Sequence, residues 1–116
     1  MVTDTALNDS DYRRLAEAVL ASVEAATDRW LQDDTIDIDC RRTGGMLELS
    51  FPNDSKIVVN LQPPLHEIWL AAQAGGFHYR WAAGRWLDTR DGSEFYAALS
   101  ALSSAQGGVP LVFSGP

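Results

Sequence analysis

The spacing of apolar side chains predicts a helix near each end of the chain. From residue 8 to residue 31, apolar positions recur every three or four residues, as on one face of an amphipathic helix. Asn8 is a suitable N-cap for this helix. A second helix is predicted to begin near Asp91, because Asp91 and Glu94 have the spacing of a capping box, and to end at Gly107-Gly108. The apolar tail at 109–116 is expected to pack along the helices.

Between the two helices the periodicity changes to two, which is typical of half-buried β-strands. About six short alternating segments follow one another, separated by turn sequences rich in Gly, Pro, Asn and Asp. The segments are 36–41, 46–51, 56–62, 67–72, 77–81 and 85–88. Since short connections favour antiparallel neighbours, we predict an α+β fold: a two-layer sandwich with two helices on one face of an antiparallel sheet of about six strands.

The alternation also predicts which face of the sheet meets water. Polar residues alternate with the apolar ones along these strands, so their side chains should point to the face that meets water. They are Asp37, Asp39, Glu48, Ser50, Asn60 and Gln62. If Ile68 and Leu70 face the core, the Trp69 indole lies on the wet face near Asn60 and Gln62. An exposed tryptophan on a polar sheet face is a plausible anchor for a partner. The alternative is that the parity is reversed and Trp69 belongs to the core.

The net charge of −7 is concentrated in the first third of the chain. Ten acids and three bases precede Cys40, whereas the other 77 residues hold six acids and six bases. A negative chain disfavours nucleic acid as a partner, because phosphate groups repel it. The sequence has no apolar run of about 20 residues, so no membrane helix is predicted. With no leader-like N-terminus and a single cysteine, the protein is expected to be cytoplasmic.

Seven carboxylates are expected to gather where the first helix packs beside the first strand. Crowded carboxylates repel one another, so an unpaired set short of positive neighbours favours a cationic partner. Hard metal ions fit, bound weakly because no calcium-loop spacing is present, and a basic protein surface fits equally well. The acids could also serve only to keep the protein soluble. The set, called the acidic ridge below, is Glu17, Glu24, Asp28, Asp33, Asp34, Asp37 and Asp39.

Nothing in the sequence predicts a catalytic site. Cys40 shares the parity of Ile36 and Ile38 and is expected to be a buried small hydrophobe, while His66 and His78 are isolated. The glycine pairs lack the downstream pattern of a phosphate-binding loop. We therefore expect a protein that is not an enzyme and holds no organic cofactor.

Residues 51–99 contain four distinctive motifs: the strand ending in Asn60 and Gln62, the Pro-x-x-x-Ile-Trp-Leu-Ala run at 64–71, Gly-Gly-Phe-His-Tyr at 75–79 and the Asp-Gly-Ser-Glu-Phe helix opening. Together these motifs resemble the bacterial (CyaY-type) frataxin family. "NDSDYRRLAEAVL" and "IDIDC" are similar to the family's opening helix and first strand. The resemblance thus covers nearly all of residues 8–108, the core of a single domain spanning 1–116.

The resemblance implies a two-layer α/β sandwich and a monomeric regulator of iron–sulfur cluster assembly. Family members bind the cysteine desulfurase through the acidic helix and first strand, and bind Fe2+ and Fe3+ weakly through the same carboxylates. By position, the acidic ridge here would bind iron and the desulfurase. Asn60, Gln62 and Trp69 would contact the assembly complex that includes the iron–sulfur scaffold.

Two departures from the family pattern bear on iron. Ala25, Arg29 and Leu31 lie where the family is often richer in acids, and the loop before the first strand looks slightly longer. Iron affinity or stoichiometry is therefore expected to be lower. Two other functions stay open: iron storage or oxidation, although the Glu-x-x-His pattern of bundle di-iron sites is missing, and a metal-independent interaction domain.

Overall fold

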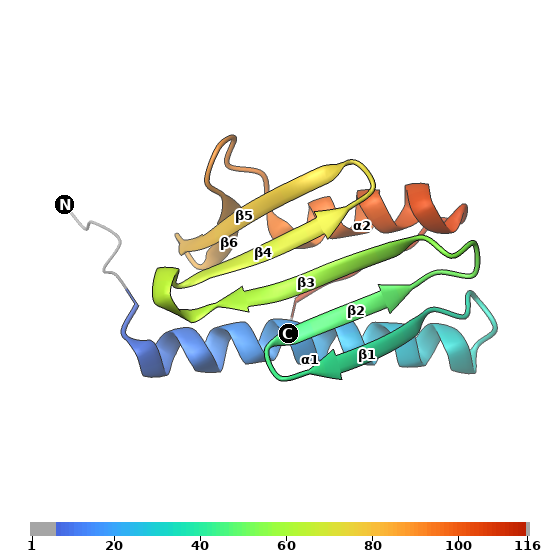
Figure 1. Ribbon diagram of the computed structural model, residues 1–116, viewed down its shortest axis with the longest axis horizontal. Coiled ribbons are helices and arrows are strands. Elements are labelled where there is room, and N and C mark those ends of the chain that lie inside the picture. The colour runs from blue at the N-terminus through green and yellow to red at the C-terminus, as the bar shows by residue number, and fades with distance from the viewer. Residues whose placement is uncertain (1–6, 116) are drawn as a thin grey trace.

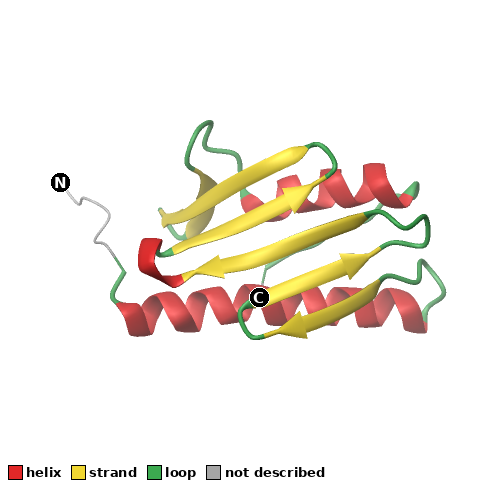
Figure 2. Ribbon diagram, viewed as in Figure 1, coloured by secondary structure: helices red, strands yellow, loops and turns green. Residues whose placement is uncertain are grey.

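The computed structural model describes residues 7–115, which form two helices and a six-stranded antiparallel sheet (Figures 1 and 2). The strands lie in the sheet in sequence order, and both helices cover the same face, which confirms the predicted α+β sandwich. The elements are α1 (Asp9–Gln32), β1 (Asp39–Thr43), β2 (Met46–Ser50), β3 (Lys56–Gln62), the 3-10 helix η1 (Pro63–Leu65), β4 (Glu67–Ala72), β5 (Gly75–Ala82), β6 (Arg85–Asp88) and α2 (Phe95–Gly107).

α2 begins later than the sequence predicts. The expected capping box at Asp91 is wrong, because the Asp91 carboxylate accepts a hydrogen bond from the Ser93 N–H at 2.9 Å and closes a turn. Glu94 is the N-cap instead, and its two carboxylate oxygens accept from backbone N–H groups of the first helical turn. The helix ends as predicted at Gly108, whose φ of 74° is a conformation that glycine adopts at little cost.

β1 also begins later than expected, although the predicted parity holds. Residues 36–38 lead into the strand without pairing, and β1 runs from Asp39 to Thr43. Ile38 is buried while Asp37 and Asp39 are exposed, so the alternation sorts these side chains before the ladder starts. On β2, β3 and β4 the same alternation places every second residue in the core.

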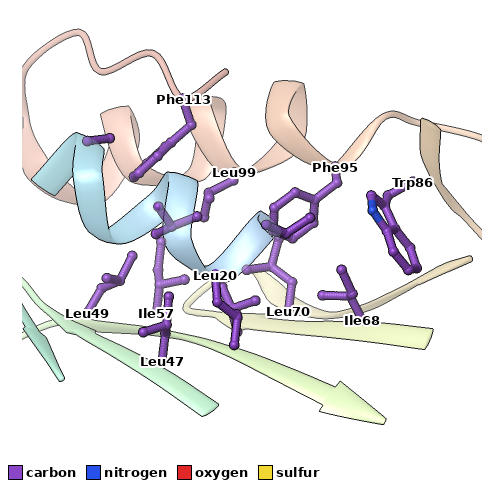
Figure 3. Close-up of a cluster of buried hydrophobic side chains, with 14 of the residues drawn as sticks. Leu20, Leu47, Leu49, Ile57, Ile68, Leu70, Trp86, Phe95, Leu99 and Phe113 are labelled. Atoms are coloured by element: carbon purple, nitrogen blue, oxygen red, sulfur yellow. The ribbon is translucent and has the colours of Figure 1, made fainter. Parts of the chain in front are cut away.

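The core fills the space between the sheet and the two helices (Figure 3). Burial of each large aliphatic or aromatic side chain contributes on the order of 1.5–3 kcal/mol to the free energy of folding. This is the main force that holds the helices on one face and leaves the other face open. Fully buried members are Ala16, Leu20, Val23, Leu47, Leu49, Ile57, Val59, Ile68, Tyr79, Phe95 and Leu99.

Tyr12 ties α1 to the strands that carry the outer-face candidates. Its ring is buried, and its hydroxyl donates to the Glu67 carbonyl oxygen at 2.7 Å and accepts from the Gln62 N–H at 3.1 Å. The ring also stacks on His66, with centroids 5.0 Å apart. These contacts fix the β3–β4 connection against the first half of α1.

The tail after α2 packs along the helices, as expected. Leu111 and Phe113 are buried, and the Phe113 ring meets Trp30 of α1 edge to face at 4.8 Å between centroids. The hydroxyls of Ser100 and Ser104 on α2 hold the tail backbone by hydrogen bonds. Neither helix within residues 7–115 is both long and apolar enough to cross a membrane.

Candidate functional site

The two glutamates of the acidic ridge are paired, contrary to the expectation that the ridge lacks positive neighbours. The Arg42 guanidinium donates to Glu17 Oε1 and, through Nη1, to Glu24 Oε1 at 2.9 Å. Arg42 reaches α1 because it is the cross-strand partner of the buried Leu47, and so points toward the helix layer. The open-edge prediction is therefore wrong for Glu17 and Glu24.

The aspartates of the acidic ridge are exposed and have few partners. Asp39 lies 3.4 Å from the Arg41 guanidinium, in a pair whose two side chains are largely in solvent. The Asp33 carboxylate accepts from both the N–H and the hydroxyl of Thr35, which closes the turn after α1. The ridge carboxylates without a hydrogen bond or ion pair among residues 7–115 are those of Asp28, Asp34 and Asp37.

α1 and β1 lie beside each other at one edge of the molecule (Figure 1), and the acidic ridge residues belong to α1, to the loop after it and to the start of β1. The seven carboxylates of the ridge and the guanidiniums of Arg29, Arg41 and Arg42 leave this edge with a formal net charge of −4. The carboxylates do not form a preorganised cage. In the part of the chain that the structure describes, no group of three or more His, Cys, Asp or Glu side chains could hold a metal ion.

Cys40 lies half-buried under this edge, where a fully buried side chain was expected. Burial raises the pKa of its thiol, a hydrogen bond with Thr27 lowers it, and the carboxylates of Glu24 and Asp28 raise it further. The net upward shift in pKa keeps the thiol protonated at neutral pH. The protonated thiol is uncharged, so Cys40 does not add to the negative charge of the ridge.

Asn60, Gln62 and Trp69 lie together on the sheet face turned away from the helices. Asn60 of β3 is the cross-strand partner of Trp69 on β4. Trp69 is half-buried and alternates with two buried residues, so the predicted parity is confirmed. A shallow depression of about 200 Å³ lies beside the indole, and its outer-face lining includes Val58, Asn60, Trp69, Ala71, Gly76 and His78.

Sequence reasoning missed three residues around Trp69, which together with it form what we call the tryptophan cluster: Glu67, Trp69, His78 and Arg80. The indole Nε1 donates to Glu67 Oε1 at 2.9 Å, and the His78 ring stacks on the indole at 4.2 Å between centroids, with 6° between the planes. Arg80 donates to Glu67 Oε2. The alternation gives all four the same face, but only the β4–β5 register shows which pairs meet.

Glu67 is a carboxylate buried on the outer face, with only 4% of its surface exposed. Burial raises the pKa of this carboxyl, but the hydrogen bonds from Trp69 and Arg80 outweigh burial and bring its pKa below the usual value. The His78 Nδ1, 3.8 Å from Glu67 Oε1, acts in the same direction. Glu67 is therefore ionised at neutral pH and remains a strong acceptor for the indole N–H.

Comparison with known proteins gives a consistent match along the chain. Residues 5–109 match the family model of the frataxin-like domain. The iron-sulfur cluster assembly protein CyaY of Polaromonas sp. (strain JS666 / ATCC BAA-500) is 52% identical over 110 residues, which is 95% of each chain. The protein of the same name from Burkholderia mallei (strain SAVP1) is 54% identical over 108 residues, covering 93% of this chain and 99% of the relative.

Solved structures show the same architecture. A frataxin from Psychromonas ingrahamii, of the CyaY protein family, superposes with a TM-score of 0.81 at 34% identity, covering 93% of this chain and 99% of its own. A trimeric yeast frataxin, complexed with ferrous iron, superposes with a TM-score of 0.65 at 23% identity, covering 93% of both chains. At that identity the yeast protein shows the fold alone.

Proposed function

The chain belongs to the frataxin-like family, and from this premise we propose that it acts in iron–sulfur cluster assembly as a monomeric, non-enzymatic regulator. The observation that carries this proposal is full-length similarity. Relatives that are 52% and 54% identical over more than nine-tenths of the chain are iron–sulfur cluster assembly proteins. The proposed regulator docks on the cysteine desulfurase and its scaffold partner, and senses iron at the same surface.

The acidic ridge is the proposed contact with the desulfurase. Its formal net charge of −4 lies on one edge, and most of its carboxylates are exposed. Such a field steers the protein toward a basic surface and speeds encounter, with an effect that salt screens over about 8–10 Å. Arg42 pairs with Glu17 and Glu24, which supports assigning the proposed contact mainly to the aspartates of the ridge.

Iron is the proposed cargo of the acidic ridge, bound weakly. Carboxylate oxygens suit hard cations such as Fe2+ and Fe3+, and Asp28, Asp34 and Asp37 have no internal partner among the described residues. Because these carboxylates form no cage, a bound ion keeps much of its water and exchanges readily. Iron would reduce the negative charge of the ridge and so weaken docking, which couples iron level to regulation.

A docking experiment tests the contact with the desulfurase. The ridge variant Asp34→Asn/Asp37→Asn removes two charges, and asparagine tolerates the positive φ of Asp34. We expect it to bind the desulfurase–scaffold complex about tenfold more weakly at low salt in calorimetry, because its steering field is reduced. The control Asp11→Asn/Asp91→Asn removes two charges outside the ridge and should bind within about twofold of the wild type. Equal losses in both variants would exclude the ridge as the contact.

A metal titration followed residue by residue tests the iron proposal. Adding Co2+ as a paramagnetic probe should broaden the NMR signals of residues 28–39 first. Because metal and desulfurase weaken each other's binding at this surface, the same broadening should need more Co2+ when the desulfurase is present. Signals that stay unchanged there would favour a metal-independent interaction domain. Oxygen consumption on adding Fe2+, above the rate without protein, would favour iron oxidation instead.

A further inference from the structure

A buried, ionised carboxylate on a sheet face open to water calls for an explanation. Glu67 has the outward parity of β4, yet its side chain is only 5% exposed. Removing a carboxylate from water costs free energy unless hydrogen bonds replace the lost hydration. An apolar residue at this position would avoid that cost but would leave the indole N–H of Trp69 without its acceptor, so the hydrogen bond that the Glu67 side chain accepts is the property that the surrounding contacts use.

Two adjacent cross-strand pairs surround the carboxylate. Glu67 pairs with Arg80, and Trp69 pairs with His78, across the β4–β5 ladder. One carboxylate oxygen accepts from the indole N–H at 2.9 Å and the other accepts from the Arg80 guanidinium. Arg80 balances the charge of Glu67, so the carboxylate can stay ionised while it is covered.

These contacts fix both degrees of freedom of the Trp69 side chain. The hydrogen bond sets the direction in which the indole edge points, and the parallel stack on His78 sets the plane of the ring. A side chain ordered before binding loses less conformational entropy when a partner covers it. The indole N–H is also already engaged, so the partner meets the ring surface and not the indole donor.

We propose that Glu67 is a positioning residue, which holds the Trp69 indole ready for contact with the assembly complex, with the His78 ring as the second support. This inference rests on the proposed function, because it assumes that Trp69 contacts that complex. It assigns Glu67 an indirect role: the carboxylate acts through the tryptophan and is itself covered. The side-chain amides of Asn60 and Gln62, which make no hydrogen bond within residues 7–115, lie beside the ring and can bind the same partner.

Two substitutions at position 67 separate positioning from charge. Glu67→Gln keeps an oxygen that accepts from the indole N–H, whereas Glu67→Leu keeps much of the volume and has no acceptor. We expect Glu67→Leu to weaken binding to the desulfurase–scaffold complex about tenfold, and Glu67→Gln to stay within about threefold of the wild type. The indole N–H signal of Trp69 should shift and exchange faster with water in Glu67→Leu only.

A variant at the second support keeps the test independent of how Glu67→Leu folds. His78 is exposed, so His78→Ala removes the stack without opening the core, and we expect a loss of about threefold to fivefold in affinity. A folded Glu67→Leu that binds like the wild type would overturn the inference. Equal losses in Glu67→Gln and Glu67→Leu would also overturn it, because charge and not positioning would then matter.

Trp69→Ala tells apart the failure of this inference and the failure of the proposed function. If Trp69→Ala weakens binding and Glu67→Leu does not, the tryptophan is a contact that needs no positioning, and only the inference fails. If Trp69→Ala leaves binding unchanged, the outer face is not a contact of the complex, and the assumption taken from the proposed function fails with it.

Discussion

The acidic ridge and the tryptophan cluster both lie at the surface of the protein, but the fold holds their side chains very differently. On the ridge, Asp28, Asp34 and Asp37 are exposed, and their carboxylates make no hydrogen bond or ion pair with another described residue. In the tryptophan cluster, one indole is fixed by a buried carboxylate and by a stacked imidazole. The ridge therefore presents net negative charge on side chains whose positions are not fixed by contacts. The tryptophan cluster presents a ring in a fixed position, and the charge of Glu67 is balanced by Arg80 within the cluster.

This difference indicates two separate tasks in recognition. Exposed charges act at a distance, set the approach of a partner and lose their effect as salt rises. A preorganised aromatic side chain contributes to binding only when a partner touches it. Its contribution to the binding free energy comes from burial of the ring and from the small loss of conformational entropy on binding. The protein would therefore be steered by the ridge and held by the outer face of the sheet.

The largest expected effect comes from removing the ring of the tryptophan cluster. Trp69→Ala should weaken binding to the desulfurase–scaffold complex about 100-fold, as for a central aromatic contact. The control Val112→Ala removes apolar surface that is 71% exposed on the tail and should change affinity by less than about twofold. Calorimetry measures both, and a Trp69→Ala loss no larger than that of the control would remove the cluster from the interface.

The next largest effect is expected at Tyr12, which links α1 to strands β3 and β4. Tyr12→Phe removes the hydroxyl that bridges Glu67 and Gln62, and leaves a buried carbonyl and N–H without that partner. The free energy of unfolding should fall by about 2 kcal/mol. Tyr96→Phe, which loses one half-buried hydrogen bond to Ser22, is the control and should cost about 1 kcal/mol or less. If urea unfolding shows the same loss of unfolding free energy in Tyr12→Phe and Tyr96→Phe, the Tyr12 bridge contributes no more than a single half-buried hydrogen bond.

A smaller effect is expected at the arginine that partly neutralises the ridge. Arg42→Gln should lower the free energy of unfolding by about 0.5–1 kcal/mol, because the half-exposed pairs with Glu17 and Glu24 are lost. Arg29→Gln removes the same charge from an exposed site and should leave stability unchanged. Both variants should dock about twofold to threefold more tightly at low salt. Weaker docking of either would contradict steering by negative charge.

The smallest effect is a pH dependence that comes from Glu67. Its pKa in the folded state lies below the usual value of 4.5, so the carboxylate contributes stability that is fully present above that pH. That stability is lost as the pH falls through the lower folded-state pKa. In Glu67→Gln the free energy of unfolding should fall less steeply with acidification below about pH 4.5. Identical slopes for both proteins in urea unfolding would contradict the downward shift in pKa.

The sequence predicts more of the outer face than of the ridge, for a physical reason. Residue parity along a strand is local, so the face occupied by Trp69 could be predicted without knowing its neighbours. The pairing of Arg42 with Glu17 and Glu24 depends on a helix and a strand that meet only in the fold. Glu67 needed the β4–β5 register, which short-range patterns do not supply.

The start of α2 shows a second limit of local patterns. Both Asp91 and Glu94 can cap a helix, and the sequence pattern favoured the earlier residue. In the fold, Asp91 closes a turn, and the buried Phe95 begins the helix instead. The choice between two competent caps is therefore made by packing, which a local sequence pattern does not contain.

The most direct test of the two-task account is the salt dependence of binding to the desulfurase–scaffold complex. The dissociation constant would be measured over a range of salt concentrations for the wild type, the ridge variant Asp34→Asn/Asp37→Asn and Trp69→Ala. We expect a flatter slope of affinity against salt for the ridge variant, and for Trp69→Ala a line parallel to that of the wild type but displaced to weaker binding. An unchanged slope in the ridge variant, or a changed slope in Trp69→Ala, would contradict the division of recognition between the two surfaces.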